Sequence, residues 1–256
     1  MTSPWYWSYG EEEAPLLLCL HGIGSCADAF EQQKELAERL GRRIVAWDAP
    51  GYRNSPDPEG APGIDGFADA AAQLITDLGY DSADVVGVSW GGVTATRLTL
   101  RHPGLVRTLT LADSSIGSGT SPERAENMRQ RPTAVVEMGL EAFARSRSPM
   151  LVSGGASQSL IDTAAQMMID SVRLPSYQWA CDSMAEADHA ARLDEIACPT
   201  LVIIGDADVI TPPELSDQLA AGISGAQLTT IVGAGHLSNQ ECPGDFNNAV
   251  ATFLAT

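Results

Sequence analysis

The stretch VVGVSWGGVTATRL, residues 85–98, decides the fold of this 256-residue chain. It places the pattern GxSxG, centred on Ser89, directly after a short apolar run typical of a buried strand and directly before a segment with helical spacing. A serine in such a turn is held in a strained backbone conformation that lifts its hydroxyl clear of the chain, and the flanking glycines let strand and helix approach closely. Ser89 is therefore the candidate nucleophile.

Outward from this stretch, short apolar runs alternate with segments of helical spacing. The runs typical of buried strands are residues 16–20, 44–47, 85–88, 106–112, 201–204 and 228–232. The helical segments are residues 27–40, 67–78, 91–101, 213–221 and 243–254. Strands and helices in alternation predict an α/β fold with a doubly wound, mostly parallel sheet.

The alternation stops between residues 117 and 193, where no strand pattern is present. That region contains four helical pieces, residues 122–131, 134–147, 157–172 and 177–191. A chain of 256 residues suits one large domain. We therefore expect a core formed by residues 1–116 and 194–256, with a helical cap of residues 117–193 inserted into it.

His236 is the expected general base. It lies in VGAGHLSNQE, residues 232–241, a glycine-flanked loop after the last predicted strand, where an imidazole can reach over the strand ends. His21 is interpreted as structural. His102, before a proline at a helix end, and His189, in a polar helical stretch, are both expected at the surface.

The acid that orients this histidine is expected in CPTLVIIGDADVITPP, residues 198–213, because such sites follow the chain order Ser, acid, His. Asp208 is favoured over Asp206, since one more turn residue lets it point back toward the base. Asp113, at the end of the 106–112 strand, is the rival, because an acid can also come from that earlier strand.

Two backbone amides are expected to stabilise an oxyanion. LLLCLHGIGS, residues 16–25, ends a strand in an HG turn of the kind that places an amide opposite a nucleophile, and Ile23 is the candidate donor there. The amide of Trp90, directly after Ser89, would be the second. Losing one such donor typically lowers the rate about 100-fold or more.

Charge and cysteine content exclude several other classes of function. The 33 acidic and 15 basic residues give a net charge of −18, which repels phosphate backbones and anionic lipid headgroups. The five cysteines are scattered and form no CxxC pair, so neither a disulfide framework nor a metal site is expected. With no signal peptide or membrane span apparent in the sequence, we predict a cytoplasmic monomer or homodimer that binds a small-molecule substrate, without nucleic acid or membrane partners.

Five motifs in order resemble the α/β-hydrolase superfamily over almost the whole chain: HGIGS (21–25), DAPGYRNS (48–55), GVSWGG (87–92), LVIIGDADVITPP (201–213) and GAGHLSNQECP (233–243). Within it, the chain is most similar to the 3-oxoadipate enol-lactonase-like and carboxylesterase branch. GHLSNQE, the ADSS at 112–115 and the length of the cap carry that closer resemblance.

The resemblance implies a cofactor-independent serine hydrolase. Ser89 would attack an ester or lactone carbonyl, His236 would take its proton, and Asp208 would orient the imidazole. One alternative is hydrolysis of a C–C bond in a β-diketone-like substrate, although Leu237 stands where such enzymes usually carry a tryptophan. Another is a receptor-like module that binds a ligand with little turnover.

Two residues are predicted to bind the substrate. Arg53 stands where the family often has glycine, in a loop after the 44–47 strand, and a guanidinium there could offset the repulsion of an anionic substrate. The alternative is that Arg53 points into water or forms an ion pair with Asp57 or Glu59. From the cap, Trp179 is expected to line the pocket, together with Met167, Met168 and Tyr177. The alternative for these four side chains is ordinary packing in the core.

Overall fold

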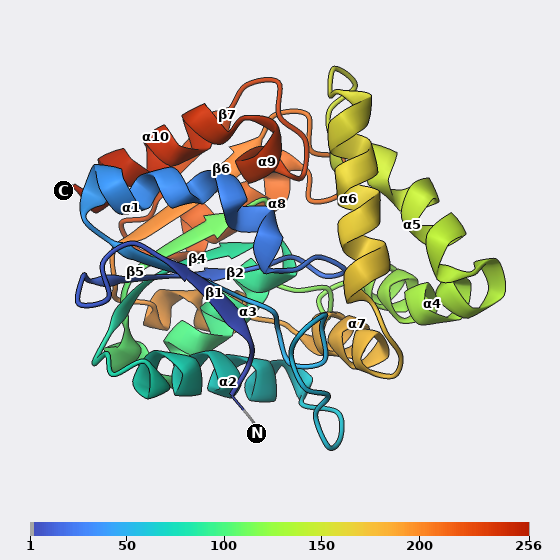
Figure 1. The fold of residues 1–256 in the computed structure, drawn as a ribbon, viewed down its shortest axis with the longest axis horizontal. Helices are drawn as coiled ribbons and strands as arrows, with labels where there is room; N and C mark the ends of the chain where they lie inside the picture. Colours follow the sequence, from blue (N-terminus) through green and yellow to red (C-terminus); the bar gives the residue numbers. More distant parts are fainter. Residues whose placement is uncertain (1–2, 256) are drawn as a thin grey trace.

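The computed structural model describes residues 3–255, in which a seven-stranded sheet lies between two layers of helices, with further helices gathered at one end (Figure 1). The strands are β1 (Tyr6–Tyr9), β2 (Leu16–Leu20), β3 (Arg43–Trp47), β4 (Ala83–Val88), β5 (Val106–Ala112), β6 (Thr200–Gly205) and β7 (Gln227–Ile231). Their order in the sheet is β1-β3-β2-β4-β5-β6-β7, and only β1 runs antiparallel to its neighbour. The predicted doubly wound α/β fold is confirmed.

The strand order reverses direction between β2 and β4. From β2 the chain moves outward to β3 and then returns to β4 on the other side of β2. In parallel sheets, ligands bind beyond the carboxyl ends of the strands at such a reversal. The turn that carries Ser89 and the HG turn of His21 both leave the sheet at this point.

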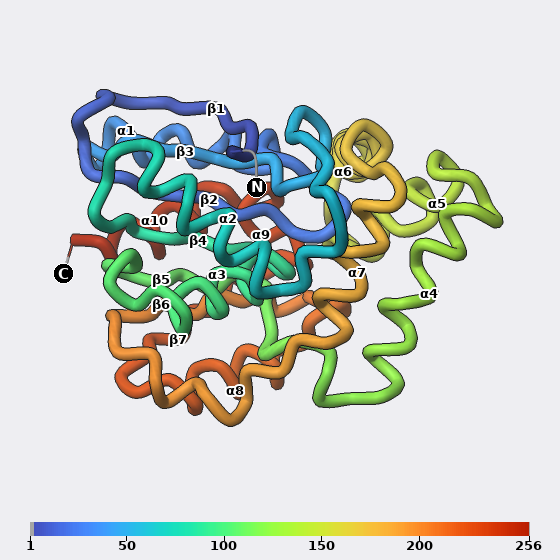
Figure 2. The backbone as a smooth tube through the Cα atoms, turned by 90° about the horizontal axis from the view of Figure 1, so that it is seen from below, coloured from blue at the N-terminus to red at the C-terminus, as the bar shows by residue number. Residues whose placement is uncertain are grey.

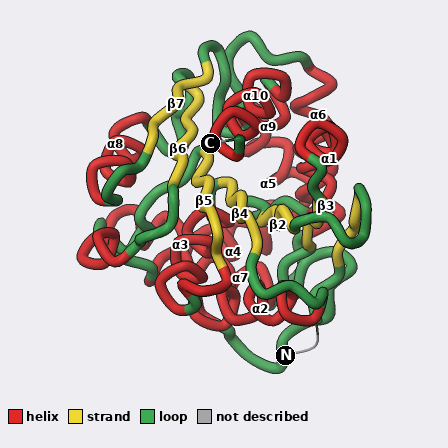
Figure 3. The backbone as a smooth tube through the Cα atoms, turned by 90° about the vertical axis from the view of Figure 1, so that its left-hand side faces the viewer, coloured by secondary structure: helices red, strands yellow, loops and turns green. Residues whose placement is uncertain are grey.

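Helices cover both faces of the sheet, which explains why its strands are apolar throughout. Figure 3 shows α1 (Glu35–Leu40) and α10 (Pro243–Leu254) on one face, and α2 (Gly63–Asp77), α3 (Trp90–Arg101) and α8 (Pro213–Gly222) on the other. In β2, Leu16, Leu18 and Leu20 pack toward the second group, whereas Leu17 and Cys19 pack toward the first. All five side chains are buried, so the strand shows no polar alternation.

Two features at the start of the chain differ from expectation. The edge strand β1 was not predicted, because its residues are half-buried or exposed and form no apolar run. The first predicted helix is two elements, the 3₁₀ helix η1 (Ala27–Lys34) and α1. Sequence patterns predict strands and helices because buried side chains are apolar. Both differences arise where the side chains are incompletely or irregularly buried.

The cap contains four α-helices, α4 (Pro122–Met138), α5 (Leu140–Arg147), α6 (Gln158–Ser171) and α7 (Ser176–Glu186), with the short 3₁₀ helices η3 (Ser148–Leu151) and η4 (Ala190–Glu195). The predicted break near residue 132 is wrong. Helix α4 continues through Pro132, although a proline there removes one intrahelical hydrogen bond, and it ends at Met138 with Gly139 as the capping residue. Gly139 has a φ of 82°, a conformation that favours glycine.

Two chain segments form a neck between this cap and the core. Three backbone hydrogen bonds link the entering and leaving segments: Ser118 to Met184 (3.1 Å), Gly119 to Ala187 (2.8 Å) and His189 to Ile116 (2.9 Å). Beyond the neck, the four cap helices lie together at one end of the molecule (Figure 2). The division into a core of residues 1–116 and 194–256 and a cap of residues 117–193 stays a prediction.

The surface position expected for His189 is wrong. This side chain is buried at the neck, where its Nε2 lies 3.2 Å from the carbonyl oxygen of Val93. Burial lowers the pKa of His189 to about 4, so the imidazole is neutral there. His102 is half-buried at the end of α3, with Nε2 2.7 Å from Asp69 Oδ1.

Two further properties bear on the class of protein. None of the helices in residues 3–255 is both long and apolar enough to cross a bilayer. All five cysteines are free thiols, of which Cys19, Cys26 and Cys181 are buried.

The turn at Ser89 depends on backbone approaches that leave no space for a side chain. A Cβ atom on Gly87 would lie 2.4 Å from the carbonyl oxygen of Gly91, and one on Gly91 would lie 2.0 Å from that of Leu20. The predicted role of the flanking glycines is therefore confirmed: they bring α3 against β4 and β2.

We predict that Gly91→Ala lowers the free energy of unfolding by more than about 3 kcal/mol, because backbone atoms of β2 and α3 would have to separate. Gly104→Ala is the control, since a Cβ there meets nothing within 4 Å, and it should cost less than about 0.5 kcal/mol. Urea unfolding followed by circular dichroism measures both. Equal stability of the two variants would contradict the packing described.

Candidate active site

Ser89 occupies a strained turn between β4 and α3. Its φ of 56° and ψ of −120° lie outside the conformations that a serine normally adopts. Hydrogen bonds hold the turn: the Ser89 amide donates to the carbonyl of Ala112 (2.9 Å), and the Ser114 hydroxyl donates to the carbonyl of Ser89 (2.8 Å). The neighbouring strand thus fixes a conformation that the local sequence disfavours.

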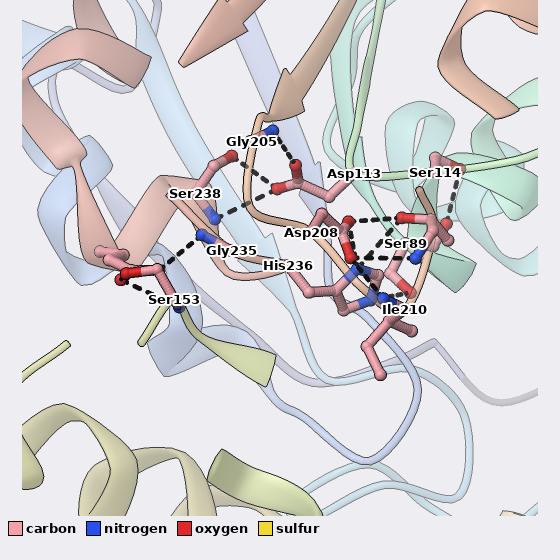
Figure 4. A network of polar contacts seen from close by, with 12 residues as sticks. Ser89, Asp113, Ser114, Ser153, Gly205, Asp208, Ile210, Gly235, His236 and Ser238 are labelled. Atoms are coloured by element: carbon pink, nitrogen blue, oxygen red, sulfur yellow. Dashed lines mark hydrogen bonds and ion pairs between the residues drawn. The ribbon is translucent and has the colours of Figure 1, made fainter. Parts of the chain in front are cut away.

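The structure brings Ser89, His236 and Asp208 together in a line of hydrogen bonds (Figure 4). The Ser89 hydroxyl donates to His236 Nε2 over 2.9 Å, and His236 Nδ1 donates to Asp208 Oδ2 over 2.8 Å. The carboxylate assigns the proton to Nδ1 and leaves Nε2 free to accept from the serine. Three segments distant in sequence meet here, each at the carboxyl end of a strand.

Asp208 is held as an anion by its surroundings. Its Oδ1 accepts hydrogen bonds from the amides of Ile210 (2.7 Å) and Thr211 (2.9 Å), and its Oδ2 accepts one from the Thr211 hydroxyl (2.6 Å). Burial by itself raises the pKa of Asp208, but the hydrogen bond and charge of His236, with the bonds from Thr211, outweigh it and lower this pKa.

Thr211 is a site residue that the sequence reasoning missed. Its hydroxyl oxygen lies 3.1 Å from His236 Nδ1 as well as beside Asp208 Oδ2. Its place three residues after the acid, in a turn, is the signal that could have found it, because threonine in such turns often bonds back to a preceding carboxylate.

Among residues 3–255, neither of the two rival acids forms a hydrogen bond with His236. Asp113 is fully buried and accepts hydrogen bonds from the amides of Gly205 (3.0 Å) and Ser238 (3.1 Å) and from the Ser238 hydroxyl (2.5 Å). Burial raises the pKa of Asp113 to about 7. Asp206 is exposed and accepts a bond from the Gly233 amide. By geometry, Asp208 is the partner of the imidazole.

Two amides beside Ser89 have no acceptor. Within residues 3–255, neither the Ile23 nor the Trp90 backbone N–H donates to a protein atom. Both residues line the same cavity as Ser89, and a Cβ on Gly22 would lie 3.2 Å from Ser89 Cβ, which places the HG turn directly against the serine. Trp90 also begins α3, whose N-terminus favours negative charge.

His21 supports this turn from beneath. It is fully buried, and the Ala49 amide donates to its Nε2 over 3.0 Å, so Nδ1 carries the proton and donates to the Gly22 carbonyl (2.8 Å). Burial lowers the pKa of His21. The neutral ring links two loops, which agrees with the structural role expected from the sequence.

Glu241 is a second residue whose contribution was not foreseen. Its carboxylate accepts hydrogen bonds from the amides of Gly235 (2.7 Å) and Ser153 (3.1 Å) and from the Ser153 hydroxyl (2.5 Å). Gly235 directly precedes His236, and Ser153 lies in the cap between η3 and α6. Glu241 therefore ties the histidine loop to the cap. Figure 4 labels the two residues that it joins, Gly235 and Ser153.

A cavity of about 490 Å³ lies over Ser89, between the core and the cap. Such a volume suits a small organic molecule. Of the residues expected to line it, Met167, Met168 and Tyr177 do so. Within residues 3–255, no group of three or more His, Cys, Asp or Glu side chains is arranged to hold a metal ion.

Neither Arg53 nor Trp179 reaches this cavity. The guanidinium of Arg53 pairs with Asp28 of η1, and its amide donates to the carbonyl of Ser171, so the side chain is already occupied. Asp28 was not among its expected partners, and Asp57 pairs with Arg173 instead. Trp179 lies on α7 two residues from Tyr177, about 200° around the helix, and so faces away from the cavity that Tyr177 lines.

The sheet, the strained serine turn and the inserted helices define a class of α/β hydrolase, and comparison with known proteins agrees. The alpha/beta hydrolase family model matches residues 17–249. The chain therefore belongs to the α/β-hydrolase family and has its fold.

Its relatives include enzymes of different chemistry. It is 26% identical to a 3-oxoadipate enol-lactonase of Acinetobacter baylyi over 251 residues, covering 97% of this chain and 92% of the lactonase. It is 31% identical to a 2-hydroxymuconate semialdehyde hydrolase of a Pseudomonas species, covering 93% and 86%. A malate-bound structure of an esterase from Thermogutta terrifontis is similar with a TM-score of 0.88 at 28% identity, covering 98% of this chain and 92% of that one.

The raised pKa of Asp113 makes stability depend on pH. Its pKa is about 7 in the folded chain and near 3.8 when unfolded, so between these values the folded state binds more protons. Stability from this group is greatest below about pH 4 and falls as pH rises through 7, by roughly 2 to 3 kcal/mol between pH 5 and pH 8.

We therefore predict that Asp113→Asn is less stable than the parent at pH 5 but loses less stability on going to pH 8. Urea unfolding of both proteins at the two pH values gives the comparison. A pH dependence identical in the two proteins would show that Asp113 titrates normally.

Proposed function

We propose that the protein is a serine hydrolase that cleaves an ester or lactone of a small organic substrate through an acyl-enzyme. The observation that carries this proposal is the line of hydrogen bonds from Ser89 through His236 to Asp208, beside two amides without acceptors. A merely structural role would not require a strained serine whose hydroxyl faces a cavity.

The chemistry follows from these positions. As the Ser89 oxygen attacks the carbonyl carbon, its proton passes to His236 Nε2, and the carbonyl oxygen becomes an anion that the amides of Ile23 and Trp90 bind. Asp208 stabilises the imidazolium that forms. The proton then passes to the leaving oxygen, and a water activated by the same histidine releases the acid and restores Ser89. No step needs a metal or an organic cofactor.

The relatives support an ester or lactone as substrate. One of them is named a lactonase and another an esterase, at 26% and 28% identity. The size of the cavity agrees with a small substrate. A cytoplasmic location and the absence of nucleic acid or membrane partners remain predictions, as does the monomeric or dimeric state.

A second candidate is hydrolysis of a C–C bond in a β-diketone-like substrate. The relative with 31% identity is named a semialdehyde hydrolase, which favours this possibility. Leu237, where enzymes of that kind usually carry tryptophan, favours the ester. Turnover of matched 4-nitrophenyl esters, lactones and β-diketones separates the two, and a receptor-like module would turn over none of them.

The nucleophile is tested by Ser89→Ala. The variant should lose covalent labelling by a fluorescent organophosphonate and lose about 10⁴-fold or more in esterase kcat, because no other hydroxyl occupies the same position. Intact-protein mass spectrometry follows the label, and Ser224→Ala, which removes an exposed hydroxyl that does not line the cavity, serves as the control. Labelling or normal turnover in Ser89→Ala would overturn the proposal.

The acid is tested by comparing two buried aspartates. Asp208→Asn should lower kcat by about 10⁴-fold, because the amide favours the wrong imidazole tautomer. Asp113→Asn should cost much less, since Asp113 bonds to the backbone and to Ser238 and not to the imidazole. Steady-state kinetics on one ester decides, and a reversal of the two effects would assign the acid to β5.

A further inference from the structure

The cavity over Ser89 is positively charged in a strongly negative protein. Three arginines line it, Arg124, Arg131 and Arg147, all from the cap. In the described part of the chain, no aspartate or glutamate lines it. With 33 acidic and 15 basic residues in the whole sequence, a random surface would show the opposite balance.

These arginines also lack carboxylate partners. Among residues 3–255, none of the three forms an ion pair, whereas Arg53, Arg97, Arg101 and Arg173 each do. All three side chains are half-buried. A half-buried guanidinium with no counter-ion is poorly stabilised, and an anion in the cavity would supply the missing partner.

On helix α4, two arginines line the cavity and the glutamates do not. Arg124 and Arg131 are seven residues apart, which places them on the same side of the helix, and Met128 lies between them on that side. The acidic residues of α4, Glu123, Glu126 and Glu137, are exposed and line no part of the cavity. Two of the three arginines of α4 therefore line the cavity, whereas none of its three glutamates does, and the third arginine, Arg129, is exposed.

Arg131 and Arg147 lie close enough to influence each other. Burial and the charge of Arg131 both lower the pKa of Arg147. Phe143 and Tyr177, whose rings pack edge to face with centroids 6.4 Å apart, form an apolar wall of the same cavity. Two like charges beside an apolar wall repel each other, and a bound carboxylate would relieve that repulsion.

We propose that Arg131 and Arg147 bind a carboxylate of the substrate, so that the site hydrolyses esters or lactones that carry a second, free carboxylate away from the scissile carbonyl. This inference rests on the proposed hydrolase function. Ser89 and His236 act on one end of the substrate, and the cap arginines hold the other end, with the apolar wall beside the carbon chain between them.

Matched substrates test the selectivity. One series consists of mono-4-nitrophenyl esters of linear dicarboxylates from succinate to suberate, and the other of the corresponding methyl 4-nitrophenyl diesters, which are neutral. With spontaneous hydrolysis subtracted, the parent should prefer the charged ester at one or more chain lengths by about 10-fold or more in kcat/KM. Raising the salt concentration should reduce this preference.

Variants with matched controls test the residues. Arg131→Gln and Arg147→Gln should each lower the charged-to-neutral ratio of kcat/KM by about 10- to 100-fold, mainly through KM. Arg129→Gln on α4 and Arg145→Gln on α5 remove exposed arginines that do not line the cavity, and they should leave the ratio unchanged. Equal losses on both esters, or no preference in the parent, would overturn the inference but leave the hydrolase proposal intact.

A binding measurement keeps the two proposals separate. Calorimetry of Ser89→Ala with glutarate, adipate and pimelate should show binding that Arg131→Gln abolishes in the double variant and that Arg129→Gln does not. This readout needs no turnover and reports on folded protein. If the parent hydrolyses no ester and Ser89 is not labelled, the hydrolase proposal fails. The binding of dicarboxylates would still show whether Arg131 and Arg147 form a carboxylate subsite.

Discussion

The close approach of α3 to the ends of β2 and β4 sets the geometry of the candidate site. Gly87 and Gly91 allow backbone atoms to meet where a Cβ would lie 2.0 to 2.4 Å from a carbonyl oxygen. This packing holds Ser89 at a φ of 56° and leaves the Trp90 amide at the start of the helix without an acceptor. A strained serine and a free donor are thus two results of one backbone arrangement.

Three aspartates near the histidine loop show how environment separates groups of the same chemistry. Asp208 accepts bonds from Thr211 and His236, which keep its pKa low despite burial. Asp113, with fewer charges to compensate burial, has a pKa near 7 and joins the end of β5 to Gly205 at the end of β6 and to Ser238 at the start of the short helix α9 (Ser238–Glu241). Asp206 lies at the surface. The proposed acid is therefore distinguished by its partners and not by its residue type.

The cap covers the cavity and is also bonded to the segments that carry His236 and Trp90. It is held at its neck by backbone hydrogen bonds and, on the other side, by Glu241, which binds both the cap at Ser153 and the histidine loop at Gly235. A hydrogen bond from the Trp90 indole to the Ser183 hydroxyl adds a third connection, directly beside the candidate nucleophile. A shift of the cap would therefore affect the positions of His236 and Trp90 as well as the proposed carboxylate subsite.

The α/β alternation, the inserted helices and the candidate residues Ser89, Asp208 and His236 could all be predicted from the sequence. These features produce local signals, because buried strands are apolar throughout and the serine turn needs glycines on both sides. Long-range pairing decided the rest. Arg53 was expected to bind the substrate because its loop follows a strand of the parallel sheet. In the structure it forms an ion pair with Asp28, which is distant from it in the sequence. The orientation of α7 turned Trp179 away, and that of α4 and α5 turned Arg131 and Arg147 inward. Which face of a helix lines a cavity depends on how the helix packs. The cap helices carry polar residues on several faces, so their sequence does not show which face points inward, and only the tertiary structure does.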